Sequence, residues 1–171
     1  MNWTAVPVAP EKVTAEALYE LGHKHRLVPE NTDLAIEYFR SMSQNCAMVK
    51  ITDGDQEIAT VIFSDIMDGE TAMVDLVPNA KYFSPVDEKG SQIENPCYEQ
   101  TREVLKPILD KLMGARDLRR ITSMIPKSRS RTMKALRECG FKKEGVMRKG
   151  VQLKGHQPED LVIMGMLRAK E

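Results

Sequence analysis

The stretch RRITSMIPKSRSRTMKALRECGFKKEG, residues 119–145, decides the fold of this chain. Alternating apolar and polar residues predict a strand over 120–125, and the proline that follows ends it because proline has no backbone N–H to donate. A short helix is predicted over about 130–138 and ends at Gly140. A further strand opens at Phe141. Strand, helix and strand in so few residues predict a β-α-β unit.

Composition indicates one soluble domain that spans residues 1–171. Hydrophobic residues make up 42% and charged residues 29% of the chain, a balance typical of globular proteins. No apolar run reaches the roughly 18 residues that a membrane span needs, and the N-terminus lacks the pattern of a signal peptide. Three distant cysteines without metal spacing indicate reduced thiols. We therefore expect a cytoplasmic protein with no membrane partner.

Charge is unevenly distributed along the chain. Residues 1–115 carry 10 Lys/Arg against 19 Asp/Glu, whereas residues 116–154 carry 13 against 3. The basic region is either a solvated face or a surface for an anionic ligand. No aromatic residue interleaves with the basic cluster, which argues against single-stranded nucleic acid. A phosphate-bearing small molecule fits this region better.

Period-2 alternation and helical spacing predict the remaining elements. The pairs Asp53-Gly54 and Asp68-Gly69 are hairpin turn signals that join three strands into an antiparallel meander. A stretch between the meander and the next helix has no clear period, which is typical of a functional loop. The predictions are a strand in 1–10, helices at 14–25 and 34–42, strands at 46–51, 57–66 and 71–77, a loop at 79–97, a helix at 98–113 with a kink or a late start at Pro107 and its end at Gly114, and a final strand at 160–167.

A meander that feeds a β-α-β unit predicts an α+β fold with a mixed, mostly antiparallel central sheet and helices on both faces. With its elements in this order, the chain resembles the GNAT superfamily of N-acetyltransferases, and specifically the branch that acetylates protein N-termini and ribosomal proteins. Members of that branch often carry the motif N-x-x-S-x-x-L-L-E-K-L-G-F-x-x-E-G. The positions here that match it or are similar are Thr132, Ala135, Leu136, Gly140, Phe141, Glu144 and Gly145.

The resemblance implies acetyl-CoA as co-substrate. The family motif Q/R-x-x-G-x-G/A cradles the pyrophosphate with backbone amides at a helix N-terminus, where the helix dipole also favours an anion. Its best register here is residues 92–97, in which Asn95 and Cys97 replace the small residues of the motif. The pantetheine arm is expected along the backbone of the strand that ends near residue 77. The expected cofactor-binding residues are Leu76, Val77, Gln92, Asn95, Cys97, Tyr98, Arg129 and Arg131.

Acetyl transfer to an amine needs a group that removes a proton and donors that stabilise the oxyanion. By its position in the family pattern, Asp75 is the expected catalytic base, and the alternative is a solvated surface carboxylate. The tyrosine that protonates the departing thiolate in many members falls at Leu136, which has no proton to give. The hydroxyls of Ser128 and Ser130 are expected to cap the following helix.

Two functions from different classes stay open. The first is an N-acetyltransferase that moves an acetyl group directly from acetyl-CoA to a protein N-terminus, a side-chain amine or a small amine. The second is a catalytically silent GNAT-like binding or structural module, such as a phage-encoded virion or host-interaction protein, which the altered loop and Leu136 favour. Nucleic-acid binding rests on charge alone. The acceptor and the oligomeric state, a homo-oligomer included, are left open by the sequence.

Overall fold

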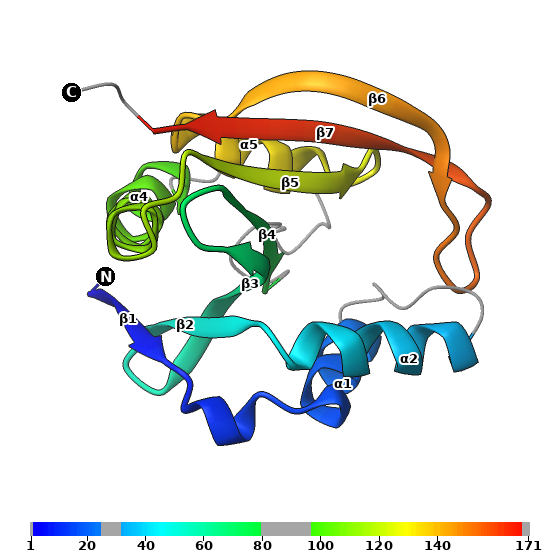
Figure 1. Cartoon of the computed structure of the whole chain (residues 1–171), viewed down its shortest axis with the longest axis horizontal. Coiled ribbons are helices and arrows are strands. Elements are labelled where there is room, and N and C mark those ends of the chain that lie inside the picture. Colours follow the sequence, from blue (N-terminus) through cyan, green and yellow to red (C-terminus); the bar gives the residue numbers. More distant parts are fainter. Residues whose placement is uncertain (1, 25–31, 80–96, 169–171) are drawn as a thin grey trace, which may run out of the picture.

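A computed structural model describes residues 2–24, 32–79 and 97–168 of the chain. Seven strands form one sheet in the order β1-β2-β3-β4-β5-β7-β6 (Figure 1). The strands are β1 (Trp3–Pro7), β2 (Ala47–Asp53), β3 (Gln56–Met67), β4 (Thr71–Pro78), β5 (Arg120–Pro126), β6 (Lys142–Val151) and β7 (Glu159–Leu167). The described helices are the 3-10 helix η1 (Pro10–Lys12) and the α-helices α1 (Ala15–Lys24), α2 (Thr32–Ser43), α4 (Cys97–Ala115) and α5 (Ser130–Glu138).

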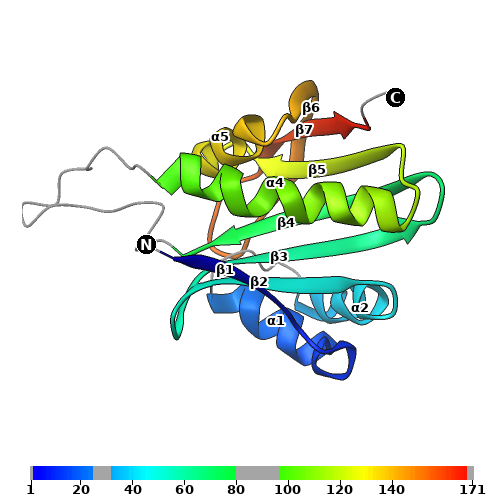
Figure 2. The same cartoon turned by 90° about the vertical axis from the view of Figure 1, so that its left-hand side faces the viewer.

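Helices cover both faces of the sheet, as the sequence predicts (Figure 2). The buried side chains of α4 and α5, among them Leu105, Leu109 and Leu136, pack in one apolar core with inward residues of the sheet. The buried side chains of α1 and α2, among them Leu18 and Phe39, form a second core on the other face. None of the helices in the described part of the chain is long and apolar enough to cross a membrane.

Strands β1 to β4 form an antiparallel meander. Gly54 and Gly69 lie in its two predicted hairpin turns with φ of +59° and +78°. Glycine suits these turns because a side chain would be strained at such angles. Local turn chemistry therefore positions β3 and β4 side by side.

Strands β4 and β5 are parallel neighbours that separate along their length. Residues 71–73 of β4 pair with residues 120–122 of β5, and no further residues of the two strands pair. Beyond this point β4 remains paired with β3, and β5 remains paired with β7. Among the described residues, the backbone edge of β4 after Met73 thus has no strand partner on the β5 side, which leaves an opening in the middle of the sheet.

The β-α-β unit is present, but its two strands are not neighbours. The final strand β7 lies between β5 and β6 and pairs antiparallel with both. Strands β5 and β6 therefore run parallel with one strand between them. Local periodicity could not predict this insertion, because it depends on pairing between distant parts of the chain.

Two helices differ from their predicted form. Helix α4 begins at Cys97 and continues through Pro107 and Gly114 to Ala115. Pro107 lies on the exposed side of the helix, where its ring and missing N–H do not disturb the core. Gly114 therefore does not end the helix, contrary to the prediction.

Helix α2 is longer than predicted, and its buried face does not include all of its large apolar residues. Ile36 and Tyr38 are apolar or aromatic, as Phe39 is. The structure buries Ala35, Phe39 and Met42 and leaves Ile36 and Tyr38 exposed, with Tyr38 at 52%. The side chain of Tyr38 is instead part of the site described next.

Candidate active site

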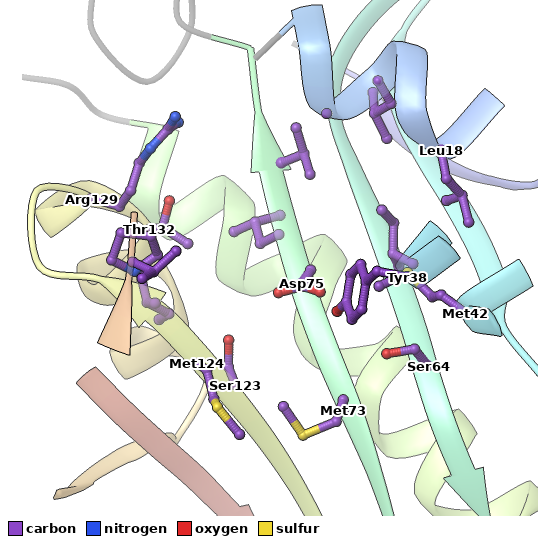
Figure 3. Close-up of a pocket in the computed structure, with 18 of the residues that line it drawn as sticks. Leu18, Tyr38, Met42, Ser64, Met73, Asp75, Ser123, Met124, Arg129 and Thr132 are labelled. Atoms are coloured by element: carbon purple, nitrogen blue, oxygen red, sulfur yellow. The ribbon is translucent and has the colours of Figure 1, made fainter. Parts of the chain in front are cut away.

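A cleft opens where β4 and β5 separate (Figure 3). Its volume is about 460 Å³, and its walls come from both faces of the sheet. On one face lie residues of α1 and α2, and on the other lies the start of α5. The lining residues used below are Leu18, Leu21, Tyr38, Phe39, Met42, Ile62, Asp65, Met73, Asp75, Leu76, Val77, Ser123 and Arg129.

Asp75 brings a carboxylate to this cleft from the unpaired part of β4. Side chains alternate along a strand, so Asp75 faces the α1 and α2 side together with Val77, while Leu76 faces the opposite core. Burial, together with the smaller effect of the nearby Asp65 carboxylate, raises the pKa of Asp75 to about 6. A carboxyl group with this pKa changes protonation state close to neutral pH.

Tyr38 lies beside Asp75, on the α2 side of the cleft (Figure 3). Although Tyr38 is half-exposed overall, desolvation of its phenol beside the cleft, together with the negative charges of Asp75 and Asp65, raises the pKa of Tyr38 to about 12. The hydroxyl consequently stays protonated over the physiological pH range. It can donate a hydrogen bond into the cleft.

Asp65 reaches the cleft from an irregularity in β3. The pairing of β3 with β4 is interrupted between Ser64 and Met67, and Asp65 has φ of +47°. Bulges of this kind turn a side chain away from the regular alternation, and aspartate tolerates a left-handed backbone better than most residues. The bulge therefore places a second carboxylate at the cleft.

Ser123 brings a hydroxyl to the cleft from β5 (Figure 3). It lies next to Thr122, the last residue of β5 that pairs with β4. Its side chain is 1% exposed, and its Oγ has no hydrogen-bond partner. A buried hydroxyl without a partner costs about 1–3 kcal/mol, so this group is one that a ligand can satisfy.

Arg129 lies where α5 begins and lines the cleft. Burial lowers the pKa of its guanidinium, and the charge of Glu159 works against that shift. The predicted caps of this helix are wrong: Arg129 is the N-cap and makes no side-chain capping bond. Ser128 instead donates its backbone N–H and its Oγ–H to the Glu159 carboxylate, at 2.9 and 3.0 Å.

The other predicted cofactor residues divide into three groups. The backbone of Leu76 and Val77 lies along the open edge of β4, as the resemblance implies. Arg131 is partly buried on α5 but is not among the residues that line the cleft. Of the remaining four, Cys97 and Tyr98 are the first residues of α4, with no side-chain description, and Gln92 and Asn95 lie outside the described residues.

Leu136 in α5 and Cys139 directly after it have structural roles. Leu136 is fully buried in the core beneath the sheet, so the position at which many family members carry the acidic tyrosine is closed to a polar group. Cys139 is also fully buried, and burial raises the pKa of its thiol to about 12. Such a thiol is not a nucleophile at neutral pH, and Cys139 packs as a small apolar residue.

Sequence reasoning missed Tyr38, Asp65 and Ser123 as site residues. One signal was available for Ser123, because it shares the apolar face of its strand with Ile121 and Ile125. A hydroxyl on an apolar face is either satisfied by a neighbour or functional. Asp65 had a weaker signal as an acid within an otherwise apolar strand, and Tyr38 had none.

The described residues contain no group of three or more His, Cys, Asp or Glu side chains that could hold a metal ion. No protein-family model matches the chain, and no curated protein matches it.

Solved structures do match. A single-residue variant of spermidine N-acetyltransferase from Vibrio cholerae is 15% identical, with a TM-score of 0.65 over 96% of this chain and 93% of that one. Ribosomal-protein-S5-alanine acetyltransferase from Vibrio fischeri is 16% identical, with a TM-score of 0.64 over 98% and 93%. A ribosomal L7/L12 α-N-protein acetyltransferase in complex with coenzyme A is 12% identical, with a TM-score of 0.64 over 98% and 94%.

The chain has the GNAT acetyltransferase fold. This confirms the α+β architecture expected from the order of the elements. The strands β4 and β5 separate beside the edge of β4 along which the family resemblance predicts the pantetheine arm.

Proposed function

We propose that the chain is an N-acetyltransferase that moves an acetyl group directly from acetyl-CoA to an amine. One observation carries the proposal: the opening between β4 and β5 brings together the unpaired edge of β4, the carboxylate of Asp75 and the orphaned hydroxyl of Ser123. The GNAT fold supports the same reading.

The residues present fit an acyl-CoA ligand. An extended arm that carries amide groups can pair with the open edge of β4 at Leu76 and Val77, as an added strand would. Arg129 offers a cation for phosphate at the α5 end of the cleft, and Arg131 offers a second one nearby. The N-terminus of α4 at Cys97 and Tyr98 favours an anion, and Gln92 and Asn95 are proposed to complete this part of the site.

When bound, acetyl-CoA supplies a thioester whose acyl carbon is open to attack by an amine. Asp75 accepts the proton that the amine nitrogen loses as the new C–N bond forms. Its pKa of about 6 keeps most molecules ionised and ready to act as base at neutral pH. Tyr38, which stays protonated beside it, donates a hydrogen bond that orients this carboxylate or the amine.

Ser123 acts at the leaving group. It shares the face of β5 that packs toward α5, opposite to the face on which Asp75 lies on β4. The C–S bond breaks with its electron pair on sulfur, and the Ser123 Oγ–H donates a hydrogen bond to that sulfur. This hydroxyl takes the place of the donor that Leu136 cannot supply.

Titration calorimetry with acetyl-CoA tests the proposal. We expect micromolar binding that weakens about tenfold or more in Arg129→Ala, because a charge-assisted contact to phosphate is lost. Arg137→Ala is the matched control, since Arg137 is an exposed arginine on the same helix outside the cleft. Transfer is then followed by release of the CoA thiol in the presence of amines.

The second candidate, a catalytically silent GNAT-like module, is favoured by Leu136 at the tyrosine position. A phage-encoded virion or host-interaction protein is one form that it could take. A dissociation constant of about 1 mM corresponds to a binding free energy of only about 4 kcal/mol. If acetyl-CoA does not bind even at about millimolar concentration, the enzyme proposal ends and the second candidate takes its place.

A further inference from the structure

The α1 and α2 side of the cleft has an apolar wall. Leu18, Phe39 and Met42 from the two helices and Ile62 from β3 line it, and all four are at most 7% exposed. They belong to the same apolar core and are held in place by packing. This wall lies on the Asp75 face of the sheet, where an acceptor amine has to reach the base (Figure 3).

The carboxylates next to this wall have no cation of their own. Asp65 and Asp75 form no ion pair with any residue in the described ranges 2–24, 32–79 and 97–168. The charge that acts on Asp75 is that of Asp65, which is also negative. Arg129, the cation among the described lining residues, is influenced by Glu159 instead. A second acid held near a partly buried acid is unfavourable unless a cation joins them.

An apolar wall beside two uncompensated carboxylates matches one kind of ligand. The ammonium group of an amine satisfies the carboxylates, and an apolar substituent on the same amine contacts the wall. A polyamine fits this arrangement poorly, because its further ammonium groups would have to lie against apolar side chains without water or partners. The orphaned hydroxyl of Ser123 lies on the other face of the sheet and independently marks the acyl-CoA side of the same cleft as unsatisfied without a ligand.

We propose that the acceptor is a primary amine carried on one apolar group of about the size of a leucine or phenylalanine side chain. Its ammonium enters between Asp65 and Asp75 and loses one proton to solvent before transfer, so that the neutral amine attacks and Asp75 accepts the second proton. Its apolar group lies against Leu18, Phe39 and Met42. The inference rests on the proposed function and adds the substrate class. The same chemistry is found in a free arylalkylamine and at the N-terminus of a peptide that begins with a large apolar residue, and the test separates these two sources.

Titration calorimetry of amines, with CoA present and at neutral pH, is the experiment. Leucinamide and glycinamide carry the same ammonium and amide and differ only in the apolar group. Full burial of that group corresponds to about a 10- to 100-fold gain in affinity, so leucinamide should bind at least about tenfold more tightly than glycinamide. Spermidine should bind no more tightly than glycinamide. Equal binding of leucinamide and glycinamide, or tightest binding of spermidine, would overturn the proposal.

Phenylethylamine and a tetrapeptide with N-terminal leucine distinguish the two sources. Tighter binding of the peptide identifies a protein N-terminus, and tighter binding of phenylethylamine identifies a free amine. Either result supports the shared chemistry when glycinamide is weaker than both. A tetrapeptide and phenylethylamine that both bind no better than glycinamide contradict it.

Asp65→Asn tests the recruiting charge without disturbing the backbone, since asparagine also tolerates the positive φ of this position. We expect leucinamide binding to weaken about threefold to tenfold, as for a partly exposed charge pair. Asp55→Asn is the matched control, because Asp55 lies in the exposed β2–β3 turn outside the cleft. Equal affinity in Asp65→Asn and the native chain would contradict the role of Asp65.

Different results would contradict the proposed substrate class and the proposed acetyl transfer. If leucinamide binds selectively but no CoA thiol is released, the amine site stands and the proposed acetyl transfer falls. If spermidine is acetylated in preference to leucinamide, the acetyl transfer stands and the substrate class falls.

Discussion

Asp75 and Ser123 lie on neighbouring strands but face opposite sides of the sheet, and the opening between β4 and β5 connects those sides. This arrangement separates the proton acceptor from the proposed leaving-group donor. The position of Asp75 could be predicted, because a family pattern places it on the strand before the cofactor backbone. The place of Ser123 beside the cleft could not be predicted, because it depends on where two strands stop pairing.

The pH dependence of the reaction tests Asp75 directly. Its pKa of about 6 predicts that kcat/KM falls steeply as the pH drops through about 6, because the base must be ionised, while the growing fraction of neutral amine adds a further rise above that pH. Asp75→Asn should lower kcat by about 10²-fold or more, since proton transfer to a positioned base contributes that much. A pH–rate profile for both proteins provides the measurement. A variant that keeps the native rate and profile would show that water, and not Asp75, accepts the proton.

Replacement of Asp75 should raise the stability of the protein at neutral pH. The pKa of Asp75 is raised from 3.8 in the unfolded chain to about 6 in the folded one, so the unfolded state ionises first as the pH rises. The folded state therefore loses stability between these two values, and the loss is complete above them. Asp75→Asn should be more stable than the native protein at neutral pH by about 1–3 kcal/mol, a difference that shrinks to zero near pH 4. Urea unfolding at several pH values measures it, and a constant difference at all pH values would contradict the assignment.

Ser123→Ala separates a catalytic hydroxyl from a structural one. Because the Oγ has no partner in the fold, its removal should leave the free energy of unfolding unchanged or raise it by up to about 1 kcal/mol. Transfer should nevertheless slow by about tenfold to a hundredfold, the effect expected when a donor to developing charge is removed. Denaturation and single-turnover kinetics on the same preparation give both values. A loss of stability together with full activity would indicate a structural hydroxyl.

At the scale of elements, β5 and α5 were predictable to within a residue because their signals are local. Proline ends the strand, and Gly140, with φ of +101°, follows the helix. The partner of Ser128 just before α5 was not predictable, since Glu159 of β7 bonds it from 31 residues away. The exposure of Tyr38 on α2 also follows from the tertiary structure, because a cleft and not the core lies beneath that side of the helix.

Helix α5 allows a prediction for a variant that carries the tyrosine of other family members at position 136. Leu136 is fully buried, so Leu136→Tyr forces a larger ring and a hydroxyl into a filled core. We expect a loss of about 1–3 kcal/mol in stability and no gain in transfer rate, because over-packing strains the core and the hydroxyl does not reach the cleft. Arg137→Tyr, on the exposed face of the same helix, is the control and should change stability little. A faster Leu136→Tyr variant would mean that this position does open onto the leaving group.

At the scale of the whole molecule, hairpin turns made the meander of β2, β3 and β4 predictable, whereas the insertion of β7 and the parting of β4 from β5 were not. Both depend on long-range pairing that no local pattern records. The sheet consists of two halves, β1 to β4 and β5 to β7. They are joined by the pairing of residues 71–73 of β4 with residues 120–122 of β5. A ligand that lies between the halves contacts both.

Ligand binding should therefore stabilise the molecule as a whole. At about 100 times its dissociation constant, acetyl-CoA should add about 2.7 kcal/mol, which corresponds to about 5–10 °C in Tm for a chain of this size. Leucinamide should add a further shift in the presence of CoA, because the proposed amine site against α1 and α2 and the proposed CoA path along β4 would occupy different parts of the cleft. Thermal unfolding with each ligand and with both measures this additivity. An amine shift that disappears when CoA is present would mean that the two compete for one part of the cleft, and the placement of the acceptor against α1 and α2 would then be wrong.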